Sequence, residues 1–288
     1  MRALGLALLL AGLAATPALT QPVCGATPVM DGLQAQLERP RGDLLIAAHR
    51  AGHLNAPENA LAAIEEAVVE GADLIEIDIK VSADGVPYLM HDQTVTRTTG
   101  GKGDAERLTY AQVRALTLKG GTEPPPTLLE ALRRSCGRVL VDLDLKTERV
   151  APIVAVVEGL GMLDQVIFFD GDSNVLRQVR KLAPTARVMP RVAERDALRD
   201  KAADLAPVAI IHGDPDSLVP ALQAGIRALP ARTWINALGE VDEAIEADAP
   251  DVCARLGALV DLDANVIQTD QPRRLRKALV ACGLKAAP

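Results

Sequence analysis

The sequence predicts an α/β protein folded as a TIM (β/α)8 barrel, with a small insertion between strand 2 and helix 2. Short apolar runs alternate with longer amphipathic stretches, and eight such units fit into about 240 residues, the size of a barrel. A doubly wound open sheet is the alternative, but the glycine-rich phosphate loop that would follow its first strand is absent. The predicted strands are Leu44–His49, Leu74–Ile79, Val139–Leu145, Val166–Phe169, Arg187–Arg191, Val208–His212, Thr233–Asn236 and Val266–Thr269. Helical patterns between them include Glu58–Glu70, Thr127–Ser135, Val150–Leu160 and Ser173–Leu182.

Composition limits the classes of function. Of 288 residues, 49% are hydrophobic and 24% are charged, which suits one well-packed domain rather than a disordered chain. The net charge of −7 argues against non-specific binding to nucleic acid or to an anionic membrane. Only 2% of the residues are aromatic, which leaves few side chains on which the bases of single-stranded nucleic acid could stack.

Residues 1–20 have the three parts of a secretory signal: Arg2, the apolar run Leu4–Leu13, and a stretch of small residues that ends at Thr20. The apolar run is too short to span a bilayer comfortably, so we expect cleavage rather than a stable membrane anchor. The mature domain would be residues 21–288, in the periplasm or secreted. No lipobox precedes the first cysteine, Cys24.

Four cysteines follow the predicted cleavage region. An even number in an exported protein permits two disulfides, and three pairings are possible. No Cys-x-x-Cys pair occurs, so we expect neither a zinc site nor thiol redox chemistry. Four separate buried thiols are the alternative. The cysteines are Cys24, Cys136, Cys253 and Cys282.

Residues 81–126 interrupt the alternation of strands and helices. The Asp84-Gly85 turn indicates that Val86–His91 doubles back as a hairpin instead of adding a barrel strand. A short helical pattern (Thr109–Leu116) and three consecutive prolines follow. We expect this insertion to lie over the barrel mouth.

Acidic residues alternate with aliphatic ones in two predicted strands. Glu76 and Asp78 share one face of the second strand, and Asp142, Asp144 and Lys146 share the corresponding face of the third. Four inward carboxylates in a buried barrel are costly without a cation, and Lys146 can neutralise only one of them. Oxygen ligands favour Ca²⁺ or Mg²⁺ over zinc, and a lysine–carboxylate network without metal is the alternative. Asp142 lies deeper and is the weakest candidate ligand.

Two histidines end segments at the predicted mouth of the barrel. His49-Arg50 ends strand 1, and His91-Asp92 ends the hairpin. Histidine can both accept and donate a proton near neutral pH, as cleavage of a phosphodiester requires. Arg50 and Lys146 supply the cations that would hold a phosphate.

These residues belong to a longer pattern that covers roughly residues 44–275. Its parts are Ala48-His49-Arg50-Ala51-Gly52, Pro57-Glu58-Asn59, Ala63, Gly71-Ala72-Asp73, Glu76, Asp78, Asp84-Gly85, His91-Asp92, Arg97-Thr98-Thr99, Gly103, Pro126-Thr127-Leu128, Asp144, Lys146, Trp234-Ile235-Asn236, Thr269-Asp270 and Pro272. The order and spacing of these parts resemble the glycerophosphodiester phosphodiesterase family.

The resemblance implies a TIM barrel that hydrolyses small glycerophosphodiesters to glycerol 3-phosphate and an alcohol. It implies that Glu76 and Asp78 bind a metal and that His49 and His91 act as general base and general acid. A substrate hydroxyl next to the phosphate can itself attack in such enzymes, giving a cyclic intermediate that water opens. Arg50 would hold the phosphate together with Lys146.

Two residues depart from the family pattern. Ala51 stands where glycine is usual after His-Arg, and Asp144 stands where the third acidic ligand is commonly glutamate. Because aspartate is one methylene shorter, the metal would sit differently or keep an extra water.

Three further residues are candidates to line the site. The resemblance implies that Glu58 lies near the metal, and capping of the following helix by Glu58-Asn59 is the structural alternative. Trp234 shares its inward face with Asn236 and either contacts substrate or packs in the core. His212 ends another strand, where a structural role is the simpler interpretation. His53 has no independent case.

Two other functions remain open. A relative that binds phosphorylated ligands without turnover would be expected to lack His49 or His91, and both are present. A lysophospholipase D-like or phosphoinositide-cleaving enzyme would need an apolar patch near the mouth, for which the aromatic-poor insertion gives little sign.

Overall fold

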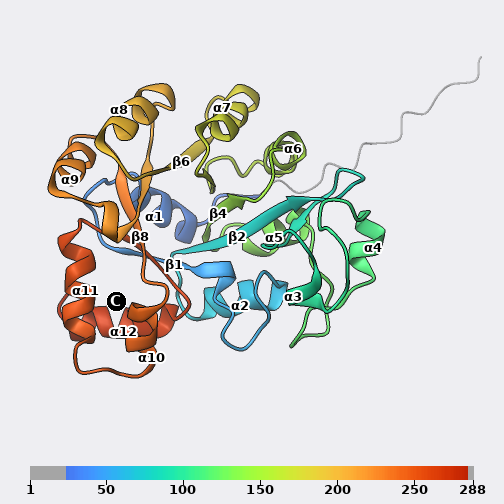
Figure 1. Ribbon diagram of the computed structural model, residues 1–288, viewed down its shortest axis with the longest axis horizontal. Helices are drawn as coiled ribbons and strands as arrows, with labels where there is room; N and C mark the ends of the chain where they lie inside the picture. Colours follow the sequence, from blue (N-terminus) through green and yellow to red (C-terminus); the bar gives the residue numbers. More distant parts are fainter. Residues whose placement is uncertain (1–23, 285–288) are drawn as a thin grey trace, which may run out of the picture.

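Eight parallel strands close into a barrel in the computed structural model, which describes residues 24–284 (Figure 1). The order is β1-β9-β8-β7-β6-β5-β4-β2, and pairing of β1 with β2 completes the ring. Every predicted strand is present, with boundaries within two residues of those expected. The signal expected over residues 1–20 lies outside the described residues. The barrel strands are β1 (Leu45–Ala48), β2 (Leu74–Val81), β4 (Leu140–Leu145), β5 (Val166–Asp170), β6 (Arg187–Val192), β7 (Ile210–Gly213), β8 (Arg232–Asn236) and β9 (Val266–Thr269).

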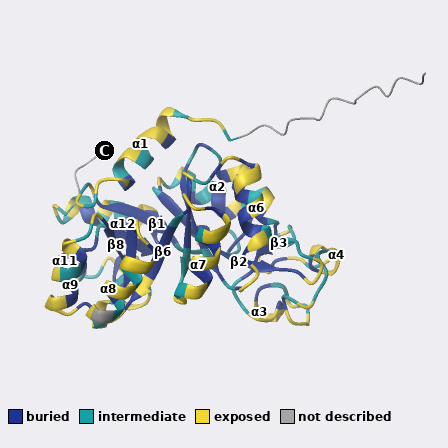
Figure 2. Ribbon diagram, turned by 90° about the horizontal axis from the view of Figure 1, so that it is seen from above, coloured by how far each residue is buried: buried dark blue, intermediate teal, exposed yellow. Residues whose placement is uncertain are grey.

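Helices surround the barrel and cover its outer face (Figures 1 and 2). On β2, Ile75, Ile77 and Ile79 belong to the core between strands and helices, as the alternation predicts. The surrounding helices are α2 (Leu61–Val69), α5 (Leu128–Ser135), α6 (Ala151–Gly159), α7 (Ser173–Leu182), α8 (Arg195–Asp204), α9 (Pro220–Arg227), α10 (Glu240–Glu246), α11 (Val252–Asp261) and α12 (Pro272–Ala281). Two short 3-10 turns, η1 (His49–Ala51) and η2 (Pro215–Ser217), follow β1 and β7.

The first outer helix begins later than predicted. Residues 58–70 were expected to be helical, but α2 starts at Leu61, and its cap residue Ala60 makes no capping bond through its side chain. Asn59 has a φ of 58°, in the left-handed region, which a continuing helix does not allow. Capping by Glu58-Asn59, the structural alternative for these residues, is therefore wrong.

A further helix, α1 (Pro28–Leu37), closes one end of the barrel (Figure 2). Its Met30 and Leu37 pack into a cluster inside the barrel that includes Trp234. Arg232, fully buried at the start of β8, donates to the carbonyls of Leu37 (3.2 Å) and Asp43 (3.0 Å). This end carries the amino termini of the strands, so the site must open at the other end.

The insertion after β2 forms a small subassembly beside the barrel, not over its mouth as expected, and its His91 lines the cavity at the carboxyl ends of the strands (Figure 1). Strand β3 (Pro87–Leu89) pairs antiparallel with β2, and Leu89 lies opposite Ile79, so the predicted hairpin is present. The short helices α3 (Thr96–Thr99) and α4 (Tyr110–Arg114) follow it. Tyr88, Met90, Val95, Ala105 and Val113 form the insertion's own apolar cluster.

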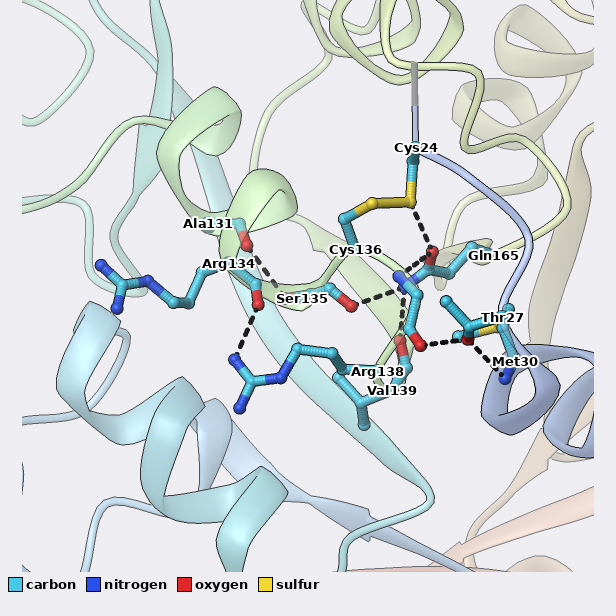
Figure 3. Close-up of a disulfide and its surroundings, with 11 residues drawn as sticks. Cys24, Thr27, Met30, Ala131, Arg134, Ser135, Cys136, Arg138, Val139 and Gln165 are labelled. Carbon is cyan, nitrogen blue, oxygen red and sulfur yellow. Dashed lines mark hydrogen bonds between the residues drawn. A yellow bond between two sulfur atoms is a disulfide. The ribbon is translucent and has the colours of Figure 1, made fainter. Parts of the chain in front are cut away.

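The four cysteines form two disulfides, and the pairing is Cys24–Cys136 and Cys253–Cys282. Around the first, Gln165 donates to the carbonyls of Ser135 (2.8 Å) and Val139 (2.7 Å) and ties the cysteine-bearing turn to the barrel (Figure 3). Within residues 24–284, no helix combines the length and the apolar character needed to cross a membrane.

Candidate active site

The inward carboxylates of β2 and β4 lie side by side. Parallel pairing sets Glu76 opposite Asp142 and Asp78 opposite Asp144. One oxygen from each of Glu76, Asp78 and Asp144 lies within 4.8 Å of the other two. Asp142, the candidate expected to be weakest, lies outside this group and is buried, with one oxygen unpartnered.

The cations nearby do not balance these charges. Lys146 Nζ donates to Asp144 Oδ2 at 2.6 Å and lies 3.5 Å from Asp78 Oδ1, and Arg50 Nε lies 3.6 Å from Asp78 Oδ2. Glu76 Oε2 accepts from two neutral donors, the Arg50 backbone N–H (2.9 Å) and the Gln268 amide (3.1 Å).

Burial, with the neighbouring carboxylates second, raises the pKa values of two members of this group. Burial, and then the charges of Asp78 and Asp144, raise the pKa of Glu76 well above its usual value. Burial likewise raises the pKa of Asp144 to about 6, although Lys146 opposes the shift. A divalent cation would relieve this crowding, and the all-oxygen donor set fits Ca²⁺ or Mg²⁺.

His49 stands at the end of β1, where the backbone turns sharply. Its Nδ1 lies 2.7 Å from Asp270 Oδ1, just beyond β9, and His53 Nε2 lies 3.0 Å from the same oxygen. Burial alone would raise the pKa of Asp270, but the hydrogen bonds from His49 and His53 hold it well below its usual value. Asp270 is therefore a carboxylate that orients His49.

His91 has a parallel arrangement on the insertion side. Its Nδ1 lies 2.7 Å from Asp92 Oδ1, and Arg97 Nε donates to Asp92 Oδ2 at 2.7 Å. These bonds, that from Arg97 first, hold the pKa of Asp92 well below its usual value. Arg97 also forms a two-pronged pair with Glu58, both bonds 2.7 Å, and Arg50 Nη1 donates to Glu58 at 3.1 Å. Ion pairs thus run from Arg97 in the insertion to Glu58, from Glu58 to Arg50, and from Arg50 to Asp78 of the carboxylate group.

One cavity of about 180 Å³ brings the main candidates together at the carboxyl ends of the strands. Arg50 and Glu58 stand beside it and connect to it through Asp78. The lining residues are His49, Glu76, Asp78, His91, Asp142, Asp144, Lys146, Phe169, Arg191, His212, Trp234, Asn236, Leu238 and Gln268.

The three possible lining residues have different surroundings. Trp234 is fully buried, and its indole N–H donates to Asn236 (3.0 Å) and Gln268 (3.3 Å), so it is part of the core with one edge at the cavity. His212 lines the cavity while only 3% exposed, and burial, then Arg191, lower its pKa to about 4, which keeps it neutral. Glu58 forms ion pairs with Arg50 and Arg97 and stands beside the cavity.

Several residues of this site were not predicted from the sequence. Asp270, Asp92 and Arg97 occur in the motifs that carry the resemblance, but only the folded structure shows which histidine or carboxylate each one contacts. Strand parity could have identified Gln268, which points inward from β9. His53 had no sequence signal.

Comparison with known protein families identifies the family of this chain. The sequence model of the "Glycerophosphoryl diester phosphodiesterase family" matches residues 49–238, which include both histidines and the three grouped carboxylates. The chain belongs to this family.

Relatives within the family cover different parts of the chain. "Probable glycerophosphodiester phosphodiesterase 2" of Mycobacterium tuberculosis is 28% identical over 90% of this chain and 97% of its own length. "Glycerophosphodiester phosphodiesterase 1" of Rattus norvegicus is 41% identical, but the match covers 41% of this chain and 39% of the rat protein. The first curated relatives are thus matched over well under half of their length.

A solved structure of a glycerophosphodiester phosphodiesterase from Agrobacterium tumefaciens is also similar. Its TM-score is 0.69 at 27% identity, over 81% of this chain and 99% of that one. A phosphodiesterase from Oleispira antarctica, solved with the product sn-glycerol-3-phosphate, shares the fold with a TM-score of 0.70 at 23% identity, over 82% of this chain and 96% of that one.

Proposed function

We propose that this family member hydrolyses glycerophosphodiesters to glycerol 3-phosphate and an alcohol, with the help of a divalent cation. The observation that carries the proposal is the shared cavity: His49 and His91 line it together with Glu76, Asp78 and Asp144. Phosphodiester cleavage needs an acid, a base and stabilisation of negative charge, and this cavity holds groups for all three.

The two histidines act as the acid/base pair in this proposal. Each has its Nδ1 on an aspartate, so an Nδ1–H that donates there leaves Nε2 for the reaction. A neutral ring takes the proton from the attacking oxygen, and a protonated ring gives one to the leaving oxygen. Either histidine can take either role in the first step.

Glu76, Asp78 and Asp144 would hold the metal, with Ca²⁺ or Mg²⁺ as the ion that suits their oxygens. When bound, the ion would supply positive charge that stabilises the phosphate oxygens. Lys146 reaches the same carboxylates and would contact phosphate directly. Arg50 would act beside it, although Glu58 also binds its guanidinium.

The cavity favours small substrates. A volume of about 180 Å³ and many charged walls suit a glycerol phosphate group, which carries little apolar surface. A lysophospholipase D-like or phosphoinositide-cleaving activity is the alternative. The sn-glycerol-3-phosphate bound to the Oleispira antarctica protein supports the simpler substrate.

A substrate panel tests this function. Purified protein would be assayed with glycerophosphocholine, glycerophosphoethanolamine, glycerophosphoinositol and a lysophospholipid, each with Mg²⁺ or Ca²⁺. We expect turnover of the small diesters, and loss of at least about 10²-fold in the variants H49A and H91A while the fold and metal binding persist. Near-wild-type turnover in either variant would disprove the acid/base pair, and a preference for the lysophospholipid would favour the alternative.

The two disulfides bear on where the protein acts. We propose that the mature protein works in the periplasm or outside the cell, because two disulfides need an oxidising compartment to form and persist. Cell fractionation and the amino-terminal sequence of the mature protein would test this. Full-length protein in the cytoplasm would contradict it.

A further inference from the structure

His53 shares a carboxylate oxygen with His49. Asp270 Oδ1 lies 2.7 Å from His49 Nδ1 and 3.0 Å from His53 Nε2, and the two rings stand edge to face with centroids 5.9 Å apart. His53 is not among the residues that line the cavity, and its side chain contacts the site through Asp270.

These three side chains are also the right types for a metal site, since their ligand atoms lie within 4.8 Å of one another. The separations between these ligand atoms are too short for a bound metal ion. Two ligand atoms around a tetrahedral ion with bonds of about 2.0–2.1 Å stand roughly 3.4 Å apart. Separations of 2.7 and 3.0 Å are instead those of hydrogen bonds.

The single negative charge of Asp270 is shared between the imidazoles of His49 and His53. If Asp270 served His49 alone, its charge would stabilise the protonated ring and keep the base occupied by a proton at higher pH. A second imidazole on the same oxygen opposes this effect when it is itself protonated, because its positive charge repels that of His49.

We infer that His53 is a positioning residue that keeps His49 neutral and ready to accept a proton, by sharing the charge of Asp270. The inference rests on the proposed role of His49. Its consequence is a lower pH at which the enzyme becomes active.

The charges around His53 favour its protonated form. The hydrogen bond to Asp270 raises the pKa of His53 against the effect of burial, and Glu58 adds to the rise while Arg50 opposes it. Asp242 stands behind Asp270 and accepts its backbone N–H at 2.7 Å, but burial raises its own pKa to about 7. On the cavity side, the charged groups that share the site with His49 are Glu76, Asp78, Asp142, Asp144 and Lys146, and none of them is changed in the His53 variants below.

Two variants separate charge from hydrogen bonding. H53A removes both, whereas H53Q keeps a neutral donor that can reach Asp270. The control is L54A, because Leu54 is the next residue and is 41% exposed. With four histidines in the chain, imidazole NMR can follow each ring through a pH titration, in full-length mature protein.

We expect the titration midpoint of His49 to rise in both H53A and H53Q by about 0.5 to 1 pH unit, the size of a unit charge 5.9 Å away at an effective dielectric constant of about 40–80. The acidic limb of kcat/KM for glycerophosphocholine should move up by the same amount, and L54A should match the wild type.

An unchanged His49 midpoint in both variants would overturn the inference, and so would a rise in H53A that H53Q abolishes. The NMR titration needs no turnover. A shifted midpoint in a protein that hydrolyses none of the substrates would therefore refute the proposed function while the coupling between the two histidines stands.

Discussion

Asn59 forms two hydrogen bonds with Asp78, one to its side chain and one from its backbone. Its amide donates to Asp78 Oδ2 at 2.8 Å, and its Oδ1 accepts the backbone N–H of Asp78 at 3.0 Å. Both residues are buried, and Asn59 reaches this position because its backbone adopts a φ of 58°. Asparagine tolerates that conformation better than most residues, so one residue type supplies both the turn and the two hydrogen bonds.

The variant N59D should therefore weaken metal binding by Glu76, Asp78 and Asp144, although aspartate has nearly the same shape as asparagine. An oxygen would replace the N–H that faces Asp78, and two buried carboxylates would repel each other. We expect a loss of about 10–100-fold in divalent-metal affinity and about 1–3 kcal/mol in the free energy of unfolding, measured by titration calorimetry and urea denaturation.

N55D is the matched control for this change. It places the same new carboxylate against Glu66, which Asn55 contacts in an exposed part of the same loop. Water screens that pair, so N55D should cost no more than about 0.5–1 kcal/mol. Equal losses in the two variants would show that the bonds between Asn59 and Asp78 do not support the site.

Removal of the metal tests the carboxylate group itself. We expect a chelator to abolish hydrolysis and Mg²⁺ or Ca²⁺ to restore it. D144N should weaken metal binding by about 10–100-fold, whereas D142N should leave it within a few-fold, because Asp142 lies outside the group of three. Retained activity in fully demetallated protein, or equal effects of the two variants, would contradict this assignment.

The sequence predicted the barrel and its acidic face for a physical reason. Parity along β2 and β4 fixes which side chains point inward, and parallel pairing then brings Glu76 and Asp78 beside Asp142 and Asp144. The strand boundaries followed from apolar runs, which sheet burial on both faces requires.

Contacts between segments outside the barrel strands could not be predicted in the same way. The bond from His49 to Asp270 joins residues 221 positions apart, and that from Arg97 to Glu58 joins residues 39 apart. Periodicity places a residue on a face of its own strand or long helix, and it gives no direction to a side chain in a turn or a helix of one turn. The late start of α2 was missed for a related reason, since tertiary contacts of Asn59 override local helix preference.

Asp242 should make stability depend on pH near neutrality. It is 6% exposed, and burial raises its pKa to about 7, although the Thr269 hydroxyl and the Asp270 backbone N–H donate to it. An aspartate in an unfolded chain loses its proton near pH 4, about three units lower. The folded state therefore binds the extra proton between these values, and its stability falls as pH rises from about 4 to 7.

The variant D242N isolates this effect because it cannot titrate. The wild-type free energy of unfolding minus that of D242N should fall by up to about 4 kcal/mol between pH 4 and pH 8, since other titrating groups cancel in the difference. Urea denaturation at several pH values measures it. A constant difference would mean that Asp242 is charged in the folded protein throughout this range.

Three successive residues after β1 have left-handed backbone conformations: Arg50 (φ 47°), Ala51 (φ 66°) and Gly52 (φ 71°). Alanine is strained there, and it stands where the family usually has glycine. A51G should therefore stabilise the protein slightly, by up to about 1 kcal/mol, because the strain relieved outweighs the added freedom of the unfolded chain.

G52A is the converse change. Its new Cβ would meet Ala48 Cβ at 3.4 Å and Pro272 Cγ at 3.5 Å, so space is adequate and backbone strain dominates. We expect a loss of about 1–2 kcal/mol in thermal or urea denaturation. Opposite signs for the two variants would confirm the strain, and a destabilising A51G would show that the Ala51 methyl group contributes more through packing.

The two disulfides should differ in how much they stabilise the fold. Cys24 and Cys136 are 112 positions apart, whereas Cys253 and Cys282 are 29 apart, so the first bond restricts the unfolded chain more. Loop entropy predicts about 5 kcal/mol for the first and about 3–4 kcal/mol for the second. Double alanine variants of each pair, unfolded in urea, would measure both. A smaller cost for the longer loop would mean that local strain or residual structure in the unfolded chain, and not loop length, sets the contribution of these bonds.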